Sequence, residues 1–168
     1  LGDQRDQLGP EHALAGGVHA EYIAVSVDHR HLTELVEGHV TDGEDVRLRD
    51  ATTAYGVLSV AGPASRDLLA AVSDVDLSNS AFPFNSLQHF HIGHAPVFAQ
   101  RLSYTGELGW EIFITPDFAE HVFEVLSTAG APMGLRLLGG EALNALRVEK
   151  GFLHWGLDMS YTEAPHQV

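Results

Sequence analysis

The segment 101–115, RLSYTGELGWEIFIT, constrains the fold more than any other part of the chain. Apolar, aromatic and β-branched residues flank a centre that contains two glycines, and this pattern predicts two antiparallel strands joined by a turn. If the loop spans residues 107–108 or 106–109, Tyr104 pairs with Glu111. Residues directly opposite in an antiparallel pair share a face of the sheet, so a phenol and a carboxylate would then lie side by side. A loop of odd length or a bulge would break this register.

The other elements follow from hydrophobic periodicity and from the positions of proline and glycine. Strands are predicted at 22–27, 46–50, 54–61, 87–92 and 96–104, and helices at 31–38, 63–72, 116–130 and 140–150. The strand 54–61 is almost entirely apolar, which predicts a central place in the sheet. Strands and helices do not alternate as they do in a doubly wound sheet. The predicted fold class is therefore α+β, a mostly antiparallel sheet with helices packed on it.

The chain has the length and composition of one domain. Its 168 residues are 45% hydrophobic, which is enough to bury a core. No apolar run approaches the ~18 residues of a membrane span. Residues 1–15 are polar and contain Gly9-Pro10, so we predict a loose amino-terminal arm there and a domain over residues 16–168.

Charge and cysteine content exclude several classes of function. The formal net charge is −14, from 23 acidic and 9 basic residues. Such a field repels nucleic acid and anionic membrane surfaces, so neither is a predicted partner. Cysteine is absent, which rules out disulfides and thiolate metal sites and fits a reducing cytoplasm. We therefore predict a cytoplasmic location.

Glu111 and Tyr104 form the candidate binding site of the hairpin. A carboxylate beside an aromatic surface suits a planar heterocycle with two adjacent N–H donors, because the carboxylate accepts two charge-assisted hydrogen bonds. The pyrimidine edge of a pterin offers such a donor pair. The structural alternative is that Glu111 faces water on an edge strand and that Tyr104 only packs within the hairpin.

The sequence gives little support for a metal site, a flavin site or a catalytic nucleophile. His89 and His91 would share a strand face and His94 follows them, but no nearby acidic residue or cysteine completes a ligand set, so no metal site is predicted. The chain contains no G-x-G-x-x-G, no P-loop and no G-x-S-x-G motif. A flavin would therefore have to be bound by another domain or another chain.

Four segments, taken in order, resemble one family. They are GGVHAEY (16–22), AYGVLSVAGPASRDLL (54–69), YTGELGWE (104–111) and ALNALRVEKGFLHWGLDM (142–159). Together they resemble the folate-binding domain of the aminomethyltransferase (glycine-cleavage T-protein) family, in the form found in the C-terminal half of dimethylglycine and sarcosine dehydrogenases. The resemblance covers about residues 16–165 and implies a partial, apparently truncated, aminomethyltransferase folate-binding fold.

The resemblance also implies roles for individual residues. Glu111 would grip the pterin of tetrahydrofolate and Tyr104 would lie beside it. Glu21 stands where the family has its catalytic aspartate, and it keeps the carboxylate on an arm one methylene longer. Trp155 occupies the position of a recurrent aromatic residue and is a candidate cofactor contact. Arg147 and Glu149 are predicted to be structural, in an ion pair with the hairpin.

The implied function is assistance of one-carbon transfer from an N-methyl amine, of the glycine, sarcosine or dimethylglycine type, to tetrahydrofolate. The domain would act either as a one-carbon transferase or as an accessory domain of an FAD-dependent N-methylglycine dehydrogenase. Its implied partners are folate, the small amine-derived donor and a flavoprotein dehydrogenase domain, which would supply any FAD site. The alternative is a truncated, non-catalytic relative that serves as an interaction or structural module. Glu21 in place of aspartate and the short segment before it motivate that alternative.

Overall fold

The computed structural model describes residues 20–24, 46–51, 53–154 and 156–160. The chain divides into two compact units, Leu1–Ala54 and Tyr55–Val168, which are treated separately below. In the first unit, β1 (Ala20–Ala24) and β2 (Val46–Asp50) pair in parallel, with Ala20 opposite Val46. The strand predicted at 46–50 is confirmed. Residues 1–19, 25–27 and the helix predicted at 31–38 lie outside the described residues.

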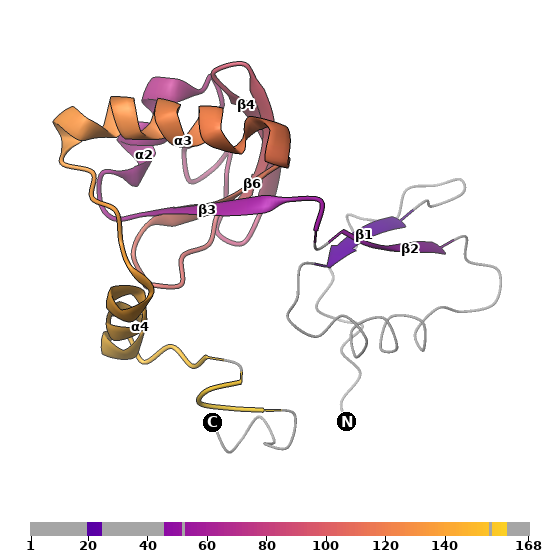
Figure 1. Cartoon of the computed structure of the whole chain (residues 1–168), viewed down its shortest axis with the longest axis vertical. Helices are drawn as coiled ribbons and strands as arrows, with labels where there is room; N and C mark the ends of the chain where they lie inside the picture. The colour runs from indigo at the N-terminus through magenta and orange to yellow at the C-terminus, as the bar shows by residue number, and fades with distance from the viewer. Residues whose placement is uncertain (1–19, 25–45, 52, 155, 161–168) are drawn as a thin grey trace. The chain divides into compact units, whose positions relative to one another are not determined.

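The second unit is built on a four-stranded antiparallel sheet (Figure 1). Its strands are β3 (Gly56–Ala61), β4 (Leu87–Ile92), β5 (Ala95–Gln100) and β6 (Gly109–Ile114), in the order β3-β6-β5-β4. The predicted α+β class with mostly antiparallel strands is confirmed. The central place predicted for the strand 54–61 is wrong, because β3 lies at an edge of the four described strands.

The apolar sequence of β3 has a different cause from the one predicted. Leu58 and Val60 face the core, whereas Val57 is 43% exposed on the opposite face. The interior strand is β6, in which Trp110 and Ile112 have no exposed surface. The sequence of β3 is almost entirely apolar although one of its faces is exposed, and this led to the wrong prediction of a central strand.

Two helices cover one face of this sheet and close the core (Figure 1). They are α2 (Ser65–Val72) and α3 (Pro116–Gly130), which also contact each other. The core combines helix residues with inward-facing strand residues, namely Leu68, Leu69, Val122 and Leu126 with Val60, Phe90, Ile92, Val97, Ala99, Trp110, Ile112 and Ile114. On α3, Val122 and Leu126 are buried in this core, and Phe118 and Val125 pack against it.

The helix ends agree with the local sequence. Thr115 is the extended residue before α3, and Pro116 takes the first helical position, where its missing N–H costs nothing. A short 3-10 turn, Ala131–Met133, follows α3. The last helix, α4 (Gly140–Glu149), ends before Gly151, which has a φ of 74° that favours glycine. No helix in the described ranges has both the length and the apolar character needed to cross a membrane.

Candidate functional site: a carboxylate on an aromatic sheet face

Glu111 lies on the face of the sheet opposite the helices. It belongs to the central strand β6, where Ser59 of β3 and Gln100 of β5 are its register partners. Its neighbours along β6, Trp110 and Ile112, point into the core. Because side chains alternate along a strand, the Glu111 carboxylate points away from the core, onto the face that α2 and α3 leave uncovered.

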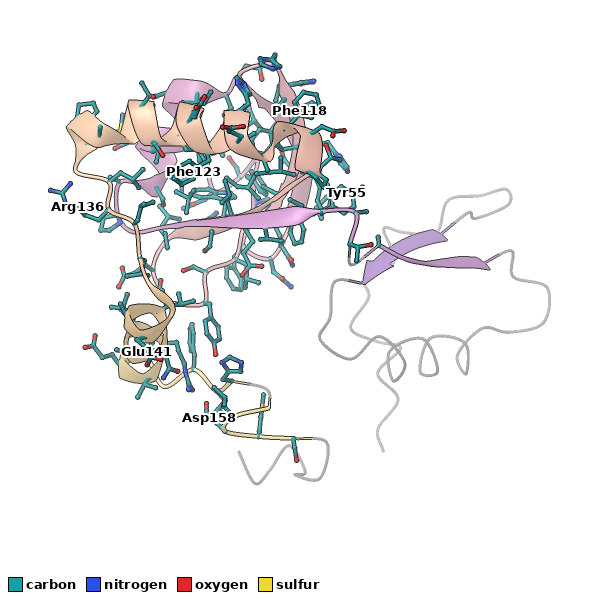
Figure 2. All side chains as sticks on the ribbon, viewed as in Figure 1. Tyr55, Phe118, Phe123, Arg136, Glu141 and Asp158 are labelled. Carbon is teal, nitrogen blue, oxygen red and sulfur yellow. The ribbon has the colours of Figure 1, made fainter. Side chains whose placement is uncertain are left out.

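This second face carries a cluster of aromatic side chains. Phe113, two residues beyond Glu111, stacks on Phe98 with ring centroids 4.7 Å apart and planes within 6°. Tyr55, which directly precedes β3 (Figure 2), meets Phe98 edge to face at 5.0 Å, and His89 lies 5.4 Å from the same ring. Phe98 and Phe113 are themselves buried, so the aromatic cluster forms an apolar, polarisable layer beside the carboxylate.

The environment of Glu111 disfavours its charge. The side chain is half-buried, and this burial raises the pKa of its carboxyl group. No hydrogen bond or ion pair to the carboxylate is found within the described part of the chain. A partly desolvated acceptor without a partner loses free energy relative to a solvated or paired one. The carboxylate is thus available to a ligand that brings its own N–H donors.

The predicted pairing of Tyr104 with Glu111 is wrong. Glu111 pairs with Gln100, and residues 101–108 form an irregular connection instead of a tight turn. We call residues 101–108 the signature loop. Tyr104 therefore lies in a loop, and its place depends on tertiary contacts instead of strand register.

Hydrogen bonds at both ends fix the signature loop on the sheet unit. At its end, the carbonyl oxygen of Leu108 accepts from the Gly62 backbone N–H at 2.8 Å and from the Ser65 hydroxyl at 3.0 Å. At its start, Arg101 donates to the carbonyl oxygen of Phe82 at 2.8 Å. These contacts hold the chain away from the short hairpin path, which explains the longer loop.

Inside the loop, two hydroxyls and one phenol are buried. Ser103 and Thr105 bond to each other through their hydroxyl oxygens at 2.9 Å. The Tyr104 hydroxyl is buried and has no hydrogen-bond partner among the described residues. Its ring meets the His154 ring edge to face, with centroids 5.6 Å apart. A buried hydroxyl without a partner is costly, because it has lost its hydrogen bonds to water without replacing them.

The end of α4 contacts the same loop. The Lys150 ammonium lies 2.9 Å from a Glu107 carboxylate oxygen, and its stem packs on Gly106. The ion pair predicted between Arg147 and the hairpin is therefore wrong, because Lys150 makes it. Both partners are about 40% exposed, so the pair orients the loop more than it stabilises the fold.

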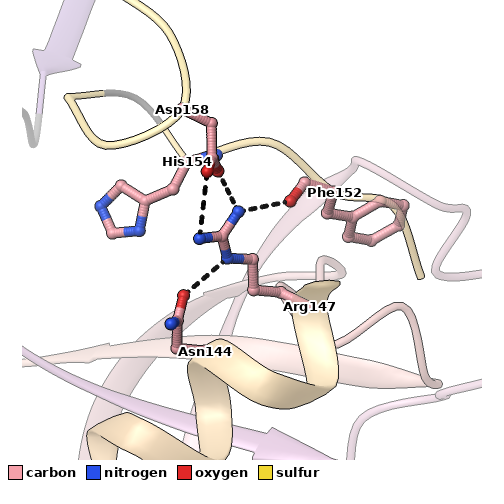
Figure 3. Close-up of polar contacts among 5 residues, drawn as sticks. All are labelled: Asn144, Arg147, Phe152, His154 and Asp158. Atoms are coloured by element: carbon pink, nitrogen blue, oxygen red, sulfur yellow. Dashed lines mark hydrogen bonds and ion pairs between the residues drawn. The ribbon is translucent and has the colours of Figure 1, made fainter. Parts of the chain in front are cut away.

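Arg147 instead joins α4 to the segment that follows it (Figure 3). The guanidinium, 4% exposed, donates from Nε to Asn144 at 2.8 Å and from Nη1 to the Phe152 carbonyl at 2.9 Å. Its terminal nitrogens face the Asp158 carboxylate. We call this Arg147–Asp158 pair the clamp. Asp158 lies beyond α4 in the chain (Figure 2), so the clamp closes residues 147–158 into a loop.

The clamp should weaken in acid. A hydrogen bond from the His154 backbone N–H, and then the one from Arg147, lower the pKa of the Asp158 carboxyl group. A lowered folded-state pKa means that the stabilisation is present above ~4 and is lost as pH falls through the folded-state value. We expect urea unfolding to give a stability gap between the parent chain and Asp158→Asn that narrows from pH 7 towards pH 3. A gap that is constant with pH would contradict this.

Glycine is favoured at two positions in and next to the signature loop, for two different steric reasons. Gly106 has a φ of 70°, and Gly109 begins β6, where an added Cβ would lie 2.8 Å from the Val60 carbonyl oxygen. That neighbour is backbone and cannot rotate away. Gly109→Ala is therefore expected to cost about 1–3 kcal/mol of unfolding free energy, as over-packing does. Chemical denaturation would measure it, with Gly139→Ala as the control because no atom lies within 4 Å of a Cβ there. Equal effects at both positions would contradict the steric reason.

The structure does not describe the side chains of two predicted site residues, Glu21 and Trp155. Glu21 lies in β1 of the first unit, opposite Arg47 in the strand register, and its side chain lies outside the description. Trp155 lies outside the described residues. Their roles therefore remain predictions.

The histidines of QHFHIGH fall on two faces. His89 and His91 share the face opposite the core, as their register partners Phe98 and Pro96 indicate. His94 instead stacks on His121 of α3, with ring centroids 3.7 Å apart. Within the ranges that the structure describes, no three metal-ligating side chains gather at one point.

A pocket of ≈ 260 Å³ lies against the signature loop, next to Phe84. It is lined by Phe84, Arg101, Leu102, Ser103, Gly106, Glu107, Leu108 and Gly109, and it includes neither Tyr104 nor Glu111. The pocket is smaller than a typical small-molecule site. The candidate site is therefore identified by the chemistry of Glu111 and Tyr104 and not by this pocket.

Comparison with known proteins identifies the family of the chain. Residues 18–168 match the GCVT N-terminal domain family. The chain belongs to this family. The relationship predicted from the four segments is thereby confirmed.

The chain is similar to proteins of two kinds, mitochondrial dehydrogenases and an aminomethyltransferase. The chain is 42% identical over 131 residues to mitochondrial dimethylglycine dehydrogenase of Mus musculus, covering 78% of the chain and 15% of the relative. It is 42% identical over 119 residues to mitochondrial sarcosine dehydrogenase of Mus musculus, covering 71% and 13%. It is 35% identical over 123 residues to aminomethyltransferase of Streptomyces avermitilis, covering 73% and 32%. The chain thus spans about a seventh of the dehydrogenases and a third of the transferase.

Sequence reasoning missed two residues of this region, His154 and Lys150. Both contact the signature loop from the far end of α4. Both residues lie more than forty positions from the loop, and hydrophobic periodicity reports only on neighbours in the sequence, so no local pattern could predict the contact. The only available sign was that they lie in one of the four family-like segments.

Proposed function

We propose that this GCVT-type domain binds tetrahydrofolate and assists one-carbon transfer from an N-methyl amine. The observation that carries the proposal is the Glu111 carboxylate, which is half-buried and unpartnered within the described residues beside an aromatic face. The adjacent ring N–H and amino groups of a pterin match such a carboxylate in charge and in number of donors. Family membership and the aminomethyltransferase relative give independent support.

Each residue has a distinct role in this proposal. Glu111 binds the pterin edge, and the Tyr104 hydroxyl, which lacks a described partner, donates to the ligand. Trp155 contributes a further cofactor contact, and Glu21 holds or moves a proton as the counterpart of the family's aspartate. The flavin dehydrogenase would first oxidise the N-methyl group to an iminium. When bound, tetrahydrofolate would supply the two nucleophilic nitrogens that take up this carbon as methylene-tetrahydrofolate, with release of the demethylated amine, which carries away the two N–H protons. Holding donor and acceptor together lowers the entropic part of the barrier.

The wider setting of the reaction is part of the same proposal. The donor would be an amine-derived one-carbon unit of the glycine, sarcosine or dimethylglycine type, as the names of two relatives suggest. FAD would be bound only by a separate dehydrogenase domain or chain. The location is proposed as cytoplasmic from the lack of cysteine, although both dehydrogenase relatives are named as mitochondrial.

Calorimetric titration of the full 168-residue chain with tetrahydrofolate tests the proposal. We expect saturable heat, and none from p-aminobenzoyl-glutamate, which has the folate tail without the pterin. A folded chain that gives no heat at millimolar tetrahydrofolate would contradict the proposal. That result would favour the second candidate, a non-catalytic interaction module, for which Glu21 in place of aspartate is the specific observation.

A further inference from the structure

We propose that His154 is a positioning residue that orients Tyr104, and that the Arg147–Asp158 clamp holds His154 in place from outside the site. The family-like sequence pattern gives no role to the residue at this position. The inference is carried by the contact between the His154 and Tyr104 rings. It also rests on the hydrogen bond that ties the His154 backbone to Asp158, within the group of residues drawn in Figure 3.

The clamp is the rigid end of this arrangement. Arg147 is almost fully buried, and its guanidinium donates to Asn144, to the Phe152 carbonyl and to Asp158. A buried guanidinium that lost one of these acceptors would keep its charge without enough partners, which is strongly unfavourable. The segment that supplies the acceptors, residues 152–158, is therefore tied to α4 at two points.

The clamp acts directly on His154. The carboxylate oxygen of Asp158 that faces Arg147 also accepts from the His154 backbone N–H at 2.7 Å. The His154 carbonyl accepts in turn from the backbone N–H groups of Leu157 and Asp158, at 3.2 and 2.9 Å. With hydrogen bonds to both its N–H and its carbonyl, His154 has a fixed backbone, which sets the direction of its Cα–Cβ bond towards the signature loop.

The His154 ring packs against the Tyr104 ring and so restricts its orientation. Its imidazole meets the Tyr104 ring edge to face at 84°, and the Tyr104 hydroxyl has no described hydrogen-bond partner that could orient the ring instead. Four residues earlier, Lys150 pairs with Glu107 of the same loop. The segment after α4 thus touches the signature loop on both sides of Gly106, and the histidine is the contact that bears on the tyrosine.

The consequence for binding depends on the proposed function. If Tyr104 contacts the ligand, a ring that is already oriented loses less side-chain entropy on binding. Removing the imidazole should then raise the Kd for tetrahydrofolate up to about tenfold, which corresponds to one immobilised side chain. Glu111, on β6, should be unaffected.

The test uses His154→Ala, His154→Phe and Asp158→Asn in the full chain, with ring-labelled tyrosine followed by NMR. Tyr104→Phe identifies the signal. We expect His154→Ala and Asp158→Asn to shift the Tyr104 signal and speed its ring flipping, and His154→Phe to restore the parent behaviour by restoring an edge-to-face ring. An unchanged Tyr104 signal in both of the first two variants would overturn the proposal.

Titration of the same variants with tetrahydrofolate separates this inference from the proposed function. A rise in Kd for His154→Ala that His154→Phe reverses supports both. If no variant and no parent chain gives heat while the Tyr104 signal responds as expected, the positioning role stands and the proposed function fails. If binding occurs and the Tyr104 signal does not respond, the proposed function stands and the positioning role fails.

Discussion

Glu111→Gln is expected to weaken tetrahydrofolate binding by about 30- to 1000-fold. Glutamine keeps the shape of the side chain but loses the charge, and its amide presents a donor to the N–H groups of the pterin. The loss of two charge-assisted hydrogen bonds, at about 2–4 kcal/mol in total, corresponds to this change in Kd. Calorimetric titration would measure it directly.

The same substitution should make the ligand-free chain more stable at neutral pH. Burial raises the pKa of Glu111, so its contribution to stability is present below the unfolded-state pKa and is lost as pH rises through the folded-state value. Glutamine removes this penalty, so a rise in Tm at neutral pH is expected.

The matched control is Gln100→Glu, which places a carboxylate at the register partner of Glu111 on β5. Two facing carboxylates repel each other, so this variant should lose stability at neutral pH and regain it in acid. If Glu111→Gln instead lowered the Tm and left Kd unchanged, the carboxylate would be a structural group and not a ligand contact.

Trp110→Ala is expected to have the largest effect on folding, at about 3–5 kcal/mol. The indole is fully buried and meets Phe82 edge to face, with centroids 6.1 Å apart. The guanidinium groups of Arg66 and Arg101 lie 5.6 and 5.9 Å from its ring. The substitution therefore leaves a cavity and also removes the surface on which two cations rest.

A loss of this size is a large part of the total stability of an ordinary domain, so the Tm should fall by at least ~10 °C. Phe123→Ala is the matched control, because Phe123 is an aromatic residue of α3 with 41% of its surface exposed. Its effect should stay within about 0.5 kcal/mol. Similar losses at Trp110 and Phe123, measured by thermal or urea unfolding, would contradict the assigned core.

The parts of the fold that local sequence determines were predicted well. The strand 87–92 alternates polar and apolar residues, and α3 has proline at its first turn and an i, i+4, i+7, i+8 stripe, so both were placed within a residue or so. The position of β3 in the sheet was predicted wrongly, because β3 lies at an edge of the four described strands. Strand order depends on which elements meet in three dimensions, and apolar residues such as Val57 can occur on an exposed face.

In the candidate site, too, features set by local sequence were predictable and features set by tertiary contacts were not. Glu111 and Phe113 lie two positions apart on β6, so the strand prediction is enough to put them on one face, where the register of β6 places them. The pairing of Tyr104 with Glu111 failed because the Leu108 carbonyl is held by Gly62 and Ser65, which makes the connection longer than a hairpin turn. His154 was not predicted because its contact with Tyr104 joins distant segments.

The most direct test of the central claim is an NMR titration of the Glu111 carboxyl carbon with and without tetrahydrofolate. Glu111→Gln identifies the signal. In the free chain, we expect a pKa above the ordinary value of about 4.3, because the group is half-buried and has no described partner. Donors from a bound pterin stabilise the charged form, so saturating tetrahydrofolate should lower this pKa. A Glu111 pKa that is the same in the free and the ligand-saturated chain would contradict the account.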